Sequence, residues 1–294
     1  MQFRPRQVPR LSLPASVGLP ASVGLPALVG LPALALAGLL FLAGTLPVVT
    51  GCATFRPQTY ASFTTSTPLP PRNYLVLGFM GGREGWDAPR QPVRILALEL
   101  RAMNLPGVHV ETVENTRRDL ALQFVRSALD RNGDGILDAQ ERASAGIILY
   151  GHSFAAAAVM KVARQLEKLG VPVLLTVQVD SVGVNDRVIP ANVARAANFY
   201  QGAGLFIRGQ EHIRAESPEK TAILGNFEYN TNSKRAVPID TSGFLWMGRV
   251  FARAHVKMAS DPAVWKRVEA LILEEVGERS TAAGGAHPAA PGPP

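Results

Sequence analysis

Residues 147–155 constrain the fold more than any other part of the chain. Ile147–Tyr150 is a short apolar run, and it leads directly into a Gly-His-Ser-Phe-Ala turn at 151–155. An alanine-rich segment with helical character, 155–168, follows at once. A strand, a sharp turn with a central serine and then a helix is the context of a nucleophile elbow. Small residues two before and two after the serine allow the tight turn. The pattern predicts Ser153 as a catalytic nucleophile.

Apolar periodicity along residues 73–279 predicts one α/β domain with a mostly parallel sheet flanked by helices. The segment 171–179 is a near-continuous apolar run, which is typical of a parallel strand covered on both faces. Further strands are predicted at 73–78, 107–113, 204–208 and 221–229, and helices at 91–104, 116–129, 189–201 and 263–276.

The predicted strand 171–179 ends at Asp180, and ligand groups of open α/β sheets collect at that edge. A serine hydroxyl needs a neighbouring imidazole to take its proton, and a carboxylate to orient the imidazole. Asp180 is therefore the candidate acid. A turn-capping role is the alternative for Asp180, and Asp186 could fill the same role.

The base must follow the acid if the chain order is serine, acid, histidine. That order excludes His109 and His152, and His287 lies in the C-terminal tail. His212 and His255 remain. We favour His255 because it lies late in the chain, just before the last predicted helix.

Main-chain amides are expected to stabilise the oxyanion. The amide of Phe154 follows the nucleophile, and the glycines after the first strand place Phe79 or Met80 as the second donor.

A calcium loop is predicted immediately before the nucleophile strand, at 130–141. The sequence Asp-Arg-Asn-Gly-Asp-Gly-Ile-Leu-Asp-Ala-Gln-Glu carries an oxygen donor at every position that an EF-hand loop requires. The loop stands alone, and its exit helix is short, which favours a structural clamp over a calcium sensor. The expected ligands are Asp130, Asn132, Asp134, the carbonyl of Ile136, Asp138 and Glu141.

The N-terminus predicts a bacterial lipoprotein. Residues 1–51 combine a basic start with a long uncharged apolar stretch, as a signal peptide does, and Val-Thr-Gly-Cys at 49–52 resembles a lipobox. Cys52 is the only cysteine, and we expect it to carry palmitate-like acyl chains. Ala53 predicts an outer-membrane protein facing the periplasm. A Ser/Thr/Pro-rich tether at 52–72 and a disordered tail at 280–294 complete the predicted organisation.

Nucleic acid is not an expected partner. The formal net charge of +7 includes three arginines within the first ten residues, and Lys and Arg form no concentrated patch with aromatic residues. The expected partners are a membrane, through Cys52, and a small acyl ester.

The chain resembles a family of bacterial α/β-hydrolase-like proteins. The resemblance is carried by the Asp-x-Asn-x-Asp-Gly loop just before Ile-Ile-Leu-Tyr-Gly-His-Ser, by the strand 172–182, and by His-Val-x-Met with Asp-Pro-x-Val-Trp near the C-terminus. It implies a triad of Ser153, Asp180 and His255 but no particular substrate. Ala155 departs from the glycine that is frequent in that family's elbow. The expected function is a lipid-anchored serine esterase, lipase or thioesterase; the alternative is a catalytically silent fold that serves as an envelope scaffold.

Overall fold

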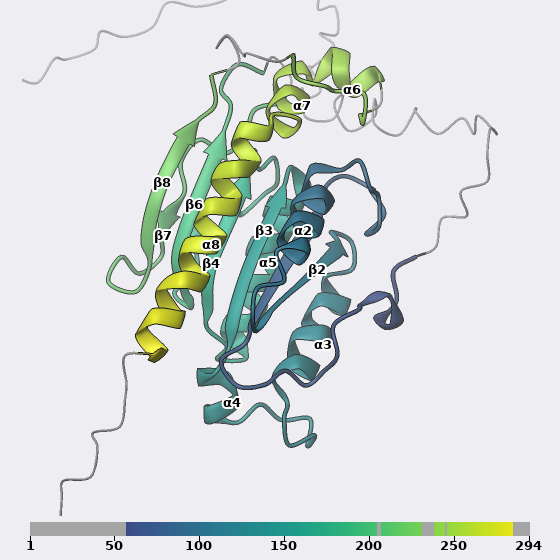
Figure 1. Cartoon of the computed structure of the whole chain (residues 1–294). Coiled ribbons are helices and arrows are strands. Elements are labelled where there is room, and N and C mark those ends of the chain that lie inside the picture. The colour runs from purple at the N-terminus through teal and green to yellow at the C-terminus, as the bar shows by residue number, and fades with distance from the viewer. Residues whose placement is uncertain (1–56, 205–206, 231–237, 245, 285–294) are drawn as a thin grey trace, which may run out of the picture. The chain divides into compact units, whose positions relative to one another are not determined.

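A parallel sheet of six strands forms the centre of the fold (Figure 1). The structure is a computed structural model and describes residues 57–204, 207–230, 238–244 and 246–284. The strand order is β2-β1-β3-β4-β6-β8, and every neighbouring pair is parallel. The strands are β1 (Tyr74–Met80), β2 (Val108–Glu114), β3 (Gly146–His152), β4 (Val173–Val179), β6 (Val193–Tyr200) and β8 (Ala222–Glu228). A separate parallel pair joins β5 (Val188–Ile189) to β7 (Arg214–Ala215).

Helices cover both faces of the sheet. One hydrophobic core joins the sheet to α3 (Arg118–Leu129) and α5 (Phe154–Lys168). The core on the other face joins it to α2 (Pro92–Ala102) and α8 (Pro262–Gly284). Shorter helices are η1 (Tyr60–Ser62), α4 (Ala139–Ala143), α6 (Trp246–Phe251) and α7 (Arg253–Ala259). The predicted α/β fold, a mostly parallel sheet flanked by helices, is confirmed.

The helix predicted at 189–201 is wrong, because most of this segment is strand β6. The strand pairs with β4 on one side and β8 on the other. Ala196 belongs to one hydrophobic core and Ala197 to the other, and both are fully buried. Alanine has high helix propensity, but here two adjacent alanines face opposite sides of a strand that is covered on both. Tertiary packing therefore decides the structure.

The boundaries of two other predictions differ. Residues 204, 207 and 208 belong to no strand, so the short strand predicted at 204–208 does not form in the part described. Helix α8 continues to Gly284, so residues 280–284, predicted as the start of a tail, are helical.

Residues 57–72, which composition assigns to a tether, pack onto the domain. The Phe63 ring stacks on Phe124 of α3 at a centroid distance of 4.0 Å. Gln58 is fully buried, donates to the Thr112 carbonyl and accepts from the Glu114 amide. The Ser/Thr/Pro content of this segment suggests a linker, but residues 57–72 instead cover part of the domain surface. We call this segment the strap.

Glu111 fastens the same strap. Its carboxylate is 1% exposed, and Oε1 accepts hydrogen bonds from the amides and hydroxyls of Thr64 and Thr65 at 2.8–2.9 Å. Oε2 is paired with Arg101 at 2.6 Å. The folded domain therefore begins before the predicted boundary at 73.

The predicted signal peptide 1–51, Cys52 and residues 285–294 lie outside the described residues. Across the helices that are described, none combines the length and apolar character needed to cross a bilayer.

Candidate active site

Ser153 lies in the turn between β3 and α5 with φ 63° and ψ −130°. A positive φ is uncommon for a residue other than glycine, and such strain concentrates at functional sites. A Cβ at Gly151 would lie 2.9 Å from the carbonyl carbon and oxygen of Ala155, so the turn requires glycine there. The Ser153 amide donates to the Val179 carbonyl at 2.9 Å, which fixes the turn to β4.

The structure brings Ser153, His255 and Asp180 together. His255 Nε2 lies 3.0 Å from Ser153 Oγ, and His255 Nδ1 lies 2.6 Å from Asp180 Oδ2. The serine and the histidine are each 7% exposed and the aspartate is fully buried. The three side chains come from the ends of β3 and β4 and from α7. Their arrangement is a continuous buried hydrogen-bond chain from carboxylate to hydroxyl.

Asp180 is fixed by residues that sequence reasoning missed. The Gln201 amide donates to Oδ1 at 3.1 Å, and its side-chain nitrogen donates to Oδ2 at 3.2 Å. Gly209 packs so closely that a Cβ there would lie 1.9 Å from Asp180 Oδ1. Gln201 directly follows β6, so identifying that segment as a strand would have placed Gln201 at the same sheet edge as Asp180.

The other candidates lie elsewhere. His212 is exposed, and its ring contacts Tyr200 at a centroid distance of 6.1 Å. The Asp186 carboxylate accepts the Ser181 hydroxyl hydrogen bond. His109 contacts the Asn73 side chain at 3.0 Å. Geometry therefore favours His255 and Asp180 as the partners of Ser153, and His287 lies beyond the described residues.

The two amides predicted to form the oxyanion site differ in position. Phe154 is the first residue of α5, where an amide has no partner within the helix. Phe79 is paired with both neighbouring strands, whereas Met80, the last residue of β1, is paired only with Glu114 of β2, and its carbonyl accepts a hydrogen bond from the Asn115 side chain. The second donor therefore stays a prediction; the first residue beyond the ladder, Gly81, lies against His152.

Two titratable groups near the turn have shifted pKa values. Burial raises the pKa of Glu84, in the loop after β1, to about 8, and a hydrogen bond from Gly81 opposes this in part. Burial, with a smaller contribution from neighbouring His255, lowers the pKa of His152 well below its ordinary value. Both groups are therefore uncharged at neutral pH.

The loop at 130–141 folds around its own oxygen atoms. Asp130 accepts from the Gly133 and Gly135 amides at 2.9 Å. Glu141 Oε1 accepts from the Arg131 amide at 2.7 Å, and Oε2 accepts from the Asp138 amide at 3.1 Å. Carboxylates, an amide and a carbonyl are the donors that calcium prefers, so the residue types fit. Among the described residues, however, no group of three Asp, Glu, His or Cys side chains is placed to hold a metal ion.

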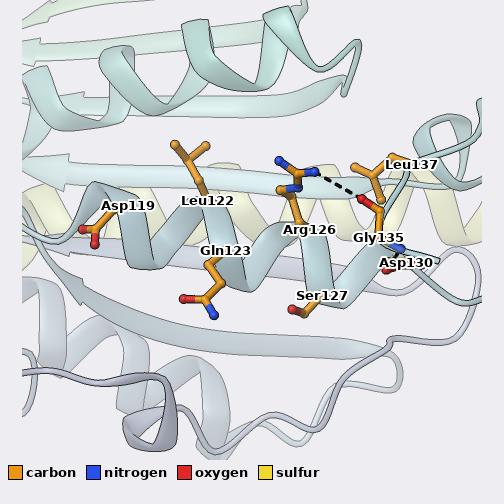
Figure 2. A pocket seen from close by; sticks show the side chains of 8 residues that line it. All are labelled: Asp119, Leu122, Gln123, Arg126, Ser127, Asp130, Gly135 and Leu137. Carbon is orange, nitrogen blue, oxygen red and sulfur yellow. Dashed lines mark hydrogen bonds between the residues drawn. The ribbon is translucent and has the colours of Figure 1, made fainter. Parts of the chain in front are cut away.

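A polar hollow of about 500 Å³ lies beside this loop, against α3 (Figure 2). Asp130, Gly135 and Leu137 line it from the loop, and Arg126 donates to the Gly135 carbonyl at 3.2 Å. The loop precedes β3 and Ser153 follows it, so the hollow and the serine lie at opposite ends of that strand.

The sheet and the serine turn define an α/β-hydrolase-like fold. The sequence matches no protein-family profile and no curated protein sequence. Among solved structures, the chain is similar to a thioesterase of prodiginine biosynthesis from Streptomyces coelicolor, with 14% identity over 66% of this chain and 86% of that chain and a TM-score of 0.30. It is similar to a cutinase-like protein from Cryptococcus sp. (14% identity, 72% and 98% coverage, TM-score 0.37). A third is a thermostable esterase from Pseudomonas putida (9% identity, 72% and 74% coverage, TM-score 0.36).

Proposed function

We propose that the protein is a serine hydrolase that cleaves an ester or thioester through an acyl-enzyme. The observation that carries this proposal is the buried chain of hydrogen bonds from Asp180 through His255 to Ser153, at 2.6 and 3.0 Å. A scaffold without catalytic activity does not require these three groups to be in contact, whereas a serine hydrolase does. The scaffold alternative expects His255 and Asp180 too far from Ser153 to act together, and it is not favoured.

His255 Nε2 takes the proton of the Ser153 hydroxyl as Oγ attacks the acyl carbon. Asp180 accepts a hydrogen bond from His255 Nδ1–H and thereby stabilises the positive charge that forms on the imidazole. The Phe154 amide donates to the oxyanion, a contribution of about 3 kcal/mol in comparable sites. His255 then returns the proton to the leaving alcohol or thiol. Water repeats the sequence on the acyl-enzyme and releases the acid.

An apolar acyl group is the proposed substrate class. Large hydrophobic side chains are exposed on the segments that carry the three groups: Phe154 beside the serine is 51% exposed, Val184 after Asp180 is 70% exposed, and Trp246 before His255 is 62% exposed. Exposed apolar patches mark binding surfaces, and the closeness of these three side chains in sequence to Ser153, Asp180 and His255 supports an apolar acyl group.

A fluorophosphonate probe tests the reaction. Labelling should require Ser153 and disappear in Ser153→Ala, whereas Ser66→Ala, at an exposed serine of the strap, should label normally. Turnover of p-nitrophenyl esters of increasing chain length then gives the acyl preference. Folded protein that shows no labelling dependent on Ser153 contradicts the proposal.

We further propose that Cys52 is acylated and anchors the protein in the outer membrane, facing the periplasm. The support is the lipobox-like sequence ending at that cysteine. Labelling with an alkynyl palmitate analogue and fractionation of membranes test this, with Cys52→Ser as the comparison. Equal membrane recovery and equal labelling of both proteins would exclude the anchor.

Calcium is proposed as a structural ion of loop 130–141. Bound there, it would supply positive charge to the carboxylates and hold the connection that leads into β3. Adding calcium to the chelated protein should raise its melting temperature, and Asp134→Ala should remove most of that rise. A melting temperature that does not respond to calcium contradicts the site, and loss of activity without loss of stability would instead indicate regulation.

A further inference from the structure

His152 precedes the proposed nucleophile, and the proposed reaction gives it no role. It ends β3 and is 4% exposed, and its ring stacks on His255 with centroids 4.6 Å apart and planes inclined by 26°. Phe244 approaches the His152 ring edge-on at a centroid distance of 6.5 Å. His255 is therefore held by hydrogen bonds at both ring nitrogens and by a second imidazole on one ring face.

The surroundings of His152 keep it neutral. Its Nε2 is buried and has no hydrogen-bond partner among the described residues. A protonated imidazole would carry N–H donors at both nitrogens, so one donor would be left without an acceptor. The adjacent ring of His255 adds like-charge repulsion whenever His255 is protonated. Charging His152 is therefore unfavourable at every stage of the reaction.

Glu84, in the loop after β1, is a further titratable group in the neighbourhood of His152. Glu84 Oε2 and His152 Nδ1 lie 3.4 and 3.5 Å from the point where a Cβ on Gly81 would be. Because burial raises the pKa of Glu84 to about 8, its carboxyl group is protonated at neutral pH and supplies no negative charge to an imidazolium. Glu84 therefore does not compensate a positive charge on His152.

We propose that His152 is a positioning residue for His255, acting as a neutral aromatic ring against one face of its imidazole. The two hydrogen bonds fix His255 within its own plane, but a ring can still tilt about the axis through them. Contact with the His152 ring opposes that tilt. An aromatic face also attracts a neighbouring cation, so the stack favours the imidazolium that forms when Nε2 takes the serine proton. This second effect rests on the proposed function; the fixing of the ring does not.

Two substitutions separate the ring from its nitrogen atoms. His152→Phe keeps an aromatic face and removes both nitrogens, whereas His152→Leu keeps an apolar side chain without a ring. Fluorophosphonate labelling rates are measured from pH 5 to 9. His152→Phe should label within about threefold of the wild type. His152→Leu should be at least about tenfold slower, and the acid limb of its pH profile should move down by roughly 0.5–1 unit, because the imidazolium loses an aromatic neighbour. His212→Leu, at the exposed histidine, should change neither quantity.

Histidine side-chain NMR provides a readout that is independent of activity, since the chain has only 5 histidines to assign. In the wild type, His152 should show no titration between pH 5 and 9. The ring signals of His255 should broaden in His152→Leu, because nothing opposes the tilt of the ring, and stay as narrow as in the wild type in His152→Phe.

Titration of His152 in the wild type overturns the proposal, even when neither variant folds. Phe and Leu variants with the same labelling rate and the same His255 line widths also overturn it. If Ser153 does not react but the His255 signals broaden as expected, the hydrolase assignment fails while the positioning of His255 stands. If Ser153 reacts but the His255 signals do not broaden, the hydrolase assignment stands and the positioning role fails.

Discussion

Replacing Glu111 with glutamine should detach the strap 57–72 from the domain. In the wild type, one buried oxygen accepts four hydrogen bonds from Thr64 and Thr65, and the other oxygen pairs with Arg101. Glutamine leaves a neutral acceptor for the threonines and turns an amide NH₂ group toward the guanidinium. Hydrogen bonds to a charged group contribute about 1 kcal/mol more than neutral ones, but four bonds to one oxygen do not add fully.

The expected loss is about 3 kcal/mol, at the lower end of the range for breaking a buried ion pair, because Arg101 is 25% exposed and keeps part of its hydration. Urea unfolding measures this loss directly, and the melting temperature should fall by roughly 6–12 °C. Glu99→Gln, at an exposed carboxylate of α2, is the matched control and should change stability very little. A loss below about 1 kcal/mol, or one equal to that of the control, would refute the role of Glu111 in fastening the strap.

Three further predictions concern the serine turn and its surroundings. Asp180→Asn should fold normally but slow Ser153 labelling by about 10³–10⁴-fold, because His255 loses the carboxylate that orients it; an unchanged rate argues against the hydrogen-bond chain. Gly151→Ala should lower the melting temperature markedly, since its Cβ would meet the Ala155 backbone at 2.9 Å, and normal stability would contradict that packing. Glu84→Gln should stabilise the protein increasingly as pH rises. Burial raises the pKa of Glu84 from its ordinary value of 4.5 to about 8 in the folded protein. The wild type therefore has its full stability below pH 4.5 and loses part of it as pH rises from there to about 8. Urea unfolding at pH 5, 7 and 9 measures the difference, which should level off above pH 8.

The strand β3 and the serine turn could be predicted because their signals are local. A short apolar run that ends in Gly-x-Ser needs no knowledge of distant residues, and the structure places a positive φ at Ser153. Sequence order also reduced the choice of base to His212 or His255. The contact with Ser153 that favours His255 over His212 spans 102 residues, so it exists only in the folded chain.

Strand β6 and the strap could not be predicted for a different reason. Ala196 and Ala197 have strong helix propensity, and nothing in their own segment shows that helices will cover both faces. Thr64 and Thr65 belong to a segment with the composition of a linker, and their partner Glu111 is more than forty residues away. Where the structure of a segment depends on partners distant in sequence, local composition predicts the wrong structure: a helix instead of β6, and a linker instead of the strap.

The wide separation of Ser153 and His255 has a consequence for the timing of activity. The proposed base, His255, lies on α7, after β8 and close to the last helix, so a partly synthesised or partly folded chain holds the Ser153 hydroxyl without this imidazole. Such a hydroxyl is a poor nucleophile. Under the proposed mechanism, Ser153 becomes reactive only when the C-terminal part of the domain has docked against β3 and β4. A probe that modifies this serine would report the fraction of molecules that have completed folding.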